Sequence, residues 1–229
     1  MTEPHDSTGE SAEPLILNLV GLRAQKNGSE IEATVILSAG NKCEARILDI
    51  RTQDFNEMKL KKGTITVETM ERLEQAAEFW SALQCGERLL AYGSNTRQLL
   101  ARKIARRGYS RRISELAAAE LDRMGLVNEE AYMRREVERG LDRLWGEGRI
   151  RNELYTRGFG RDTMELLPEM LAEADLAENC ARLIEKLFDD LPADRAEERR
   201  MIAVLLRYGY RMDEIRAAVR RLREAERDR

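Results

Sequence analysis

The chain has 229 residues, of which 42% are hydrophobic and 35% charged, so it can bury one large core or two small ones. Its net charge of −3 does not favour a protein that coats nucleic acid through overall charge alone. No apolar run is long enough to cross a bilayer, and the start of the chain is acidic rather than a basic, hydrophobic signal, so a cytoplasmic protein is expected.

Histidine and cysteine are too sparse for the common catalytic and metal sites. The single histidine, His5, lies in an acidic tail at residues 1–14, which is expected to be disordered and unable to hold an imidazole rigidly. Cys43, Cys85 and Cys180 show no C-x-x-C spacing, so buried, reduced thiols are expected rather than disulfides or zinc ligands. We therefore expect a protein that is not an enzyme and has no metal or cofactor.

A small β-rich module is predicted at residues 15–67. Asn27-Gly28 and residues 39–42 are turn signals, and apolar residues alternate between them, which is typical of a strand with one buried face. The strands are predicted at residues 15–22, 31–37, 43–50 and, more briefly, 61–67.

From Glu68 onward the apolar residues follow helical spacing, and residues 68–80 are predicted as a linking helix. Three Gly-aromatic pairs then recur at intervals of 50 and 51 residues: Gly108-Tyr109, Gly158-Phe159 and Gly209-Tyr210. Apolar residues stand four and eight positions before each glycine, and leucine stands 13 positions after it. This recurrence indicates an internal repeat.

Each of these glycines is predicted to end a helix, because the C′ position takes a left-handed conformation that a Cβ atom penalises. In this arrangement the following residue packs against the residue four positions before the glycine. The expected pairs are Tyr109 with Ile104, Phe159 with Leu154, and Tyr210 with Leu205. The aromatic residues are therefore expected to pack in a core rather than to stack on nucleic-acid bases.

Other helical stretches precede the glycine-ended helices, at residues 81–92, 129–144 and 177–189. Pro192 and a capping-box spacing of Asp194 and Glu197 mark a helix start inside the third repeat. Gly146-Glu147-Gly148 is predicted as a turn between helices rather than a phosphate loop.

The predicted fold is mainly α, with three tandem three-helix repeats after the β-rich module. The repeats are expected at residues 81–128, 129–176 and 177–229, and to stack into an elongated, curved array. A monomer is expected.

Several segments resemble the RecX family of regulatory proteins. R-Q-L-L-A-R-K-I at residues 97–104 and S-R-R-I-S-E-L at 110–116 look like the first repeat of that family. The stretch from Gly125 to Phe159, which includes G-E-G-R-I-R-N-E-L-Y-T-R-G-F, is similar to its second repeat. Residues 60–73 are similar to the segment between a β-rich extension and the repeats in some members. The resemblance implies a protein that binds the RecA recombinase and its filament on DNA, and limits strand exchange and the coprotease step of the SOS response.

Two basic strips are the candidate partner-binding residues, for RecA carboxylates or for DNA phosphates in sequence-neutral contacts. The first strip has no acidic residue among residues 97–112 and consists of Arg97, Arg102, Lys103, Arg106, Arg107, Arg111 and Arg112. The second strip consists of Arg149, Arg151, Arg157 and Arg161. The alternative interpretation is a solvated helix face for the first strip and scattered surface arginines for the second.

Two other functions fit the same residues. A helical module of another pathway could bind nucleic acid without RecA, and an adaptor could bind an unrelated protein. For the RecA hypothesis, charge reversal at Arg106, Arg107 and Arg111 is expected to weaken partner binding and leave the helices intact.

Overall fold

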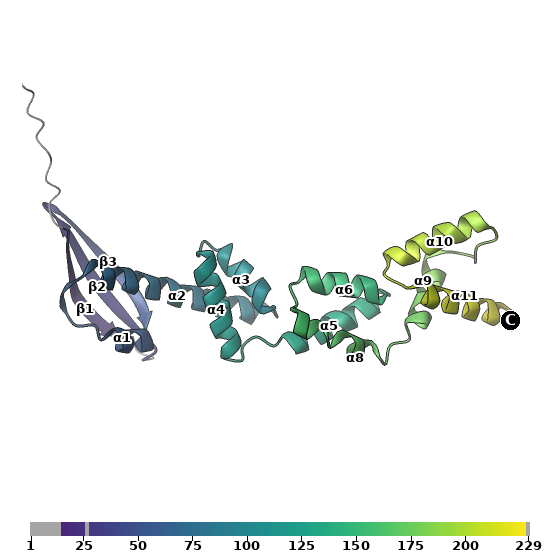
Figure 1. Ribbon diagram of the computed structural model, residues 1–229, viewed down its shortest axis with the longest axis horizontal. Helices are drawn as coiled ribbons and strands as arrows, with labels where there is room; N and C mark the ends of the chain where they lie inside the picture. The colour runs from purple at the N-terminus through teal and green to yellow at the C-terminus, as the bar shows by residue number, and fades with distance from the viewer. Residues whose placement is uncertain (1–14, 26–27, 228–229) are drawn as a thin grey trace, which may run out of the picture. The chain divides into compact units, whose positions relative to one another are not determined.

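The computed structural model describes residues 15–25 and 28–227 (Figure 1). The acidic tail predicted at residues 1–14, and Asn27 of the first predicted turn, lie outside the described residues. The chain forms two compact units, one made of the described residues up to 85 together with 108–117, and one of residues 86–107 and 118–227. The predicted fold class is confirmed, because a small N-terminal sheet precedes helices that run to residue 227.

The described residues at the start of the chain form a four-stranded antiparallel sheet in the order β3-β2-β1-β4 (Figure 1). Its strands are β1 (Ile16–Ala24), β2 (Glu30–Ala39), β3 (Lys42–Arg51) and β4 (Gly63–Ile65). Ile31, Ala33 and Val35 alternate along β2 with their side chains buried, as their period of two predicted.

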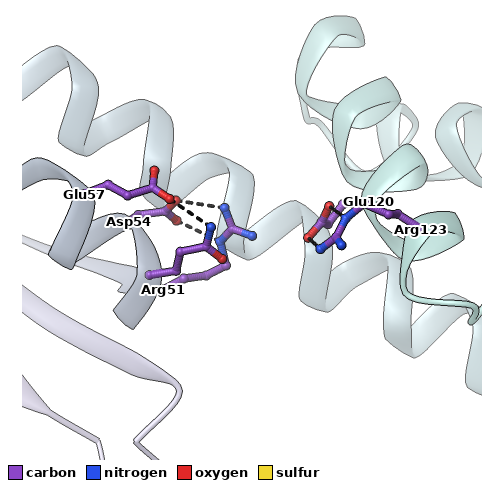
Figure 2. A network of polar contacts seen from close by, with 6 residues as sticks. Arg51, Asp54, Glu57, Glu120 and Arg123 are labelled. Atoms are coloured by element: carbon purple, nitrogen blue, oxygen red, sulfur yellow. Dashed lines mark hydrogen bonds and ion pairs between the residues drawn. The ribbon is translucent and has the colours of Figure 1, made fainter.

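Helix α1 (Thr52–Met58) follows β3 directly and was not expected from the sequence. Arg51 donates to both carboxylate oxygens of Asp54, at 2.8 Å each, and Gln53 donates to Glu57 at 2.9 Å (Figure 2). A seven-residue helix shows too few turns for its period to stand out in a sequence, and these local contacts hold it in place.

Helix α2 (Val67–Tyr92) is a single helix of 26 residues, whereas the sequence suggested a linking helix at 68–80 followed by another at 81–92. Met70 and Leu73 are buried in the same apolar core as the strands. Trp80 Nε1 donates to a Glu30 carboxylate oxygen at 2.8 Å. The first half of α2 therefore covers the sheet rather than only linking it to the repeats.

The helices after α2 have these bounds: α3 (Arg97–Ala105), α4 (Arg111–Arg123), α5 (Glu129–Asp142), α6 (Glu147–Thr156), α7 (Arg161–Met164), α8 (Leu167–Leu171), α9 (Leu176–Leu187), α10 (Arg195–Arg207) and α11 (Met212–Arg227). The helical segment between Gly158 and Leu171 is divided into α7 and α8. Pro168 explains the break, because proline has no N–H to donate and its ring excludes the carbonyl four residues earlier.

The helix-ending glycines have the predicted conformation. Gly108, Gly158 and Gly209 have φ angles of +104°, +81° and +91°. The N–H of Phe159 donates to the Leu154 carbonyl at 3.2 Å, and the N–H of Tyr210 donates to the Leu205 carbonyl at 3.2 Å. These bonds define the Schellman ending that the sequence predicted.

The helix starts agree with the predicted capping residues. Asp194 caps α10 by accepting from the N–H groups of Ala196 and Glu197, at 2.7 and 2.8 Å. The Glu197 carboxylate reaches back to the N–H of Ala193 at 3.0 Å, one residue before the position that a standard capping box would use.

The three thiols differ in exposure, and the expectation that all are buried is wrong for Cys43. Cys43 is exposed on the edge strand β3, whereas Cys85 and Cys180 are buried. Burial raises the pKa of the Cys180 thiol to about 12. Reactivity requires an accessible thiolate, so a disulfide reagent at neutral pH is expected to modify one thiol per native chain and three after denaturation. A Cys43→Ser variant should lose the native reaction, and a native reaction that persists in it would contradict this assignment.

Candidate partner-binding surface

A junction between α3 and the end of α6 joins the first helical repeat to the second. Thr96 caps α3 by accepting from the N–H of Leu99 at 3.0 Å, and its hydroxyl also donates to the Arg157 carbonyl at 2.9 Å. The side chains of Gln98 and Arg102 lie directly beside Gly158. The positive end of the α3 dipole therefore meets the negative end of α6, which is a favourable arrangement.

The second and third repeats meet in the equivalent way. Gly146, which lies 50 residues after Thr96, donates its N–H to the Tyr208 carbonyl at 2.9 Å. The N–H of Gly148 donates to the Gly209 carbonyl at 2.9 Å. A Cβ atom on Gly146 would lie 2.5 Å from the backbone of Gly209, so only glycine permits this approach. The prediction of a turn between helices at residues 146–148 is wrong in detail, because Gly146 caps α6 and Glu147 and Gly148 are its first residues. Their contact with Gly209 was not foreseen.

Arg149, from the second basic strip, is part of this second junction. Its guanidinium lies 4.5 Å from the centre of the Trp145 ring and 5.0 Å from that of Tyr208. Cation–π contacts of this kind stabilise a partly buried arginine by about 0.5–2 kcal/mol. Arg149 therefore contributes to the contact between the second and third repeats.

Arg157 is likewise engaged inside the second repeat. Its guanidinium lies 3.2 Å from the buried carboxylate of Glu136 and 2.8 Å from that of Glu153, and it donates to the Tyr132 hydroxyl at 3.1 Å. Burial by itself would lower the pKa of Arg157, but the hydrogen bond to Tyr132 and the two carboxylates raise it above its ordinary value. The guanidinium is thus a fixed positive charge that neutralises Glu136.

Replacing Arg157 with glutamine is expected to lower the free energy of unfolding by about 1–3 kcal/mol, because Glu136 and Tyr132 lose a buried partner. Urea denaturation followed by circular dichroism would measure this loss. Arg161→Gln is the matched control, since Arg161 is exposed and should change stability by less than about 0.5 kcal/mol. Unchanged stability of the Arg157 variant would instead favour a role in partner binding.

The remaining members of the second strip differ from each other. Arg151 pairs with Glu147 one turn earlier on α6, and Glu147 also accepts from Arg211 at 2.7 Å. Arg161 is exposed at the start of α7, with no carboxylate within 4.0 Å among the residues that the structure describes. Of the four residues, the structure leaves only Arg161 exposed and unneutralised.

The first strip is also divided by its contacts. Within the larger unit, Arg97 lies 3.8 Å from Asp122 and its N–H donates to Glu129, while Lys103 donates to Asn95. No ion pair is found for the exposed Arg102, Arg106 and Arg107 with any other described residue. We call these last three residues the α3 arginine group.

In the other unit, Arg111 and Arg112 begin α4. Arg111 donates to Glu115 at 2.8 Å, four residues later, so the strip does have an acidic partner just beyond its end. Arg112 is exposed, without an ion pair to other residues in the described part of the chain. Arginines outside the two strips are also neutralised by carboxylates. Arg123, for example, donates to both carboxylate oxygens of Glu120 at 2.8 Å (Figure 2).

Three titratable groups, Cys180, Tyr210 and Glu214, lie near one another in the third repeat. Burial raises the pKa values of Tyr210 and Glu214, but the Tyr210 hydroxyl is already committed to the Leu144 carbonyl at 3.0 Å. Among the described residues, no group of three or more histidine, cysteine or acidic side chains could hold a metal ion. In the same residues, every helix is too short or too polar to cross a membrane.

Comparison with known proteins identifies relatives of the chain. Regulatory protein RecX of Halorhodospira halophila is 36% identical over 136 residues, which are 57% of this chain and 81% of that protein. Regulatory protein RecX of Stenotrophomonas maltophilia is 28% identical over 58% of this chain and 81% of its own length. A crystal structure of a regulatory protein RecX matches with a TM-score of 0.66 and 19% identity, over 86% of this chain and 96% of that one. No protein-family model matches the chain.

Proposed function

Because the chain belongs to the RecX family of regulatory proteins, we propose that it binds the RecA recombinase and its filament on DNA. In this role it limits strand exchange and coprotease activity, and so regulates DNA repair and the SOS response without a chemical step of its own. The observation that supports the proposal is the sequence identity to curated RecX proteins over most of their length.

Exposed arginines that lack a neutralising carboxylate supply the binding chemistry. The α3 arginine group offers planar guanidinium groups that can take a carboxylate or a phosphate in a bidentate manner. Arg112 and Arg161 offer the same chemistry at other places in the chain. Arg149, Arg151 and Arg157 have contacts within the protein and contribute to binding chiefly by maintaining the fold. Arg97 and Arg111 are exposed and partly neutralised by single surface carboxylates, so each offers a weaker charge to a partner.

The proposal is tested by adding the protein to RecA-driven strand exchange and, separately, to RecA-stimulated repressor cleavage. We expect both rates to fall as the protein approaches the RecA concentration. Unchanged rates in both assays, with protein that is folded by circular dichroism, would remove the RecA assignment.

An Arg106→Glu, Arg107→Glu double variant is expected to need about threefold to tenfold more protein for the same inhibition. Each reversal removes a cation from the binding surface and adds a charge of the wrong sign. The two arginines also complement the C-terminal dipole of α3, so a stability loss of about 0.3–1 kcal/mol each is expected and is read from thermal melting. The control is Arg199→Glu, Arg200→Glu, an equal change of charge at two exposed arginines of α10. Equal inhibition by both variants would show that the α3 arginine group is only a solvated surface.

A second candidate function is nucleic-acid binding that does not involve RecA, which the unneutralised arginines also favour. Filter binding to single- and double-stranded DNA, with and without RecA, separates the two functions. Retention of DNA by the protein alone, combined with no effect on RecA, would favour this second function. Such binding should weaken steeply as salt is added, because phosphate contacts release counterions.

A further inference from the structure

A groove of about 460 Å³ lies between α10 and α11 in the third repeat. The buried side chains of Met201 and Ile215 form its floor, and Ile202, Met212 and Val219 line its walls. Apolar side chains from two helices thus face a space that no described residue fills. Ala218, three residues after Ile215, packs with residues of α9 in the core of the third repeat.

A stripe of four arginines borders the groove along α11: Arg216, Arg220, Arg223 and Arg227. Their spacing of four, three and four residues places them on one face of the helix. None has a carboxylate within 4.0 Å among the described residues. Arg221, on another face of α11, pairs instead with Asp175 at 2.8 Å and with Glu178 at 3.5 Å. The structure therefore neutralises the arginine outside the groove and leaves those at its border unpaired.

The charges and the size of the groove together indicate which kind of partner would bind there. Glu198 and Glu224 also line the groove, so four positive charges face two negative ones and leave an excess of two positive charges. A cavity of this size takes several apolar side chains, although not a whole helix. A helix lying along the groove would insert only the apolar residues of one face, in the manner of other helix-in-groove complexes.

We propose that this groove binds an amphipathic helical segment of a partner protein, with apolar anchors in the groove and acidic residues against the arginine stripe. A nucleic-acid backbone would engage the arginines but leave the apolar floor exposed to water. A purely apolar helix would leave the arginines unpaired. The site is separate in sequence from the α3 arginine group, and the proposal does not require that the partner be RecA.

The test uses the full chain and a fluorescein-labelled amphipathic peptide that carries leucine at helical spacing and glutamate at its other positions. Fluorescence anisotropy should show saturable binding that weakens as salt is added, because part of the attraction is between exposed charges. An Arg216→Glu, Arg220→Glu, Arg223→Glu variant should bind at least about tenfold more weakly. The matched control, Arg195→Glu, Arg199→Glu, Arg200→Glu, makes the same change of charge on exposed residues outside the groove and should retain binding.

Circular dichroism and thermal melting establish that each variant is folded. Ile202→Glu supplies an independent check, because a half-buried wall residue that becomes acidic should repel the peptide without touching the arginines.

Three outcomes would overturn the proposal. Equal binding by a peptide of the same composition with a scrambled apolar face would show that charge alone is recognised. A single-stranded oligonucleotide that displaces the peptide and depends on the same arginines would assign the groove to nucleic acid. A shift from dimer to monomer in light scattering on reversal of the stripe would assign it to a second copy of the chain. Inhibition of RecA is measured separately, so failure here leaves the proposed function standing.

Discussion

Replacing Gly209 with alanine is expected to lower the free energy of unfolding by about 2–5 kcal/mol, with most of the loss falling on the third repeat. Two effects add. Gly209 has a φ of +91°, where an L-residue is strained by about 1–2 kcal/mol. The new Cβ atom would also lie 2.1 Å from the backbone nitrogen of Arg149, and backbone cannot move aside as a flexible side chain can.

Gly125→Ala is the matched control for this prediction. Gly125 has a φ of +74° and ends a helix in the same way, with the N–H of Leu126 donating to the Leu121 carbonyl at 3.0 Å. Nothing lies within 4 Å of its added Cβ atom, so only the conformational strain of about 1–2 kcal/mol is expected. Urea denaturation of both variants measures the difference. If both variants lose the same free energy of unfolding, the close approach of Gly209 to Arg149 adds nothing to the cost of the backbone strain.

Leu154→Ala is expected to cost about 2–5 kcal/mol through lost burial and the cavity that remains. Leu154 is 1% exposed in a core that also contains Phe159 and Ile150. Its carbonyl accepts the Schellman bond from Phe159, so its side chain and its backbone serve the same helix ending. The truncation should therefore also destabilise the turn at Gly158, next to which the Thr96 hydroxyl donates to the Arg157 carbonyl.

The control for the leucine is Leu116→Ala on α4, which removes the same atoms from a side chain that is 48% exposed. Its effect should stay within about 0.5 kcal/mol. Denaturant midpoints and slopes for both variants test the pair. A small loss at Leu154, similar to that at Leu116, would show that the core of the second repeat can close around the missing atoms.

The binding strips show where sequence reasoning was limited. Charge runs were visible, but some of the carboxylates that neutralise them come from other helices. Asp122 of α4 lies 3.8 Å from the Arg97 guanidinium, and Glu136 of α5 pairs with Arg157. A contact of the Arg157–Glu136 kind depends on how α5 and α6 pack, and no spacing along the chain predicts it. Glu115, Glu147 and Glu153 were within reach of a simple rule, since each lies four residues from its arginine on the same helix.

Leu144 illustrates a backbone feature that the residue type conceals. It has a φ of +55° and ends α5, with the N–H of Trp145 donating to the Gly140 carbonyl at 3.0 Å. Glycine is the usual residue at such a position, so nothing in the sequence pointed to a Schellman ending here. The side chain of Leu144 is 7% exposed and belongs to the core of the third repeat, and this burial offsets the local strain.

The sequence by itself determined the features that local chemistry controls: the change from strand to helix spacing, the threefold recurrence, and the glycines that end helices with an aromatic residue packed behind them. Each follows from the conformational limits of one residue or from the period of one element, so a short stretch of sequence is enough to predict it. The tertiary structure alone decided which arginines remain free, which glycines touch backbone from the next repeat, and where the groove of the third repeat lies. Those features depend largely on contacts between different helices, and such contacts arise only when the helices pack.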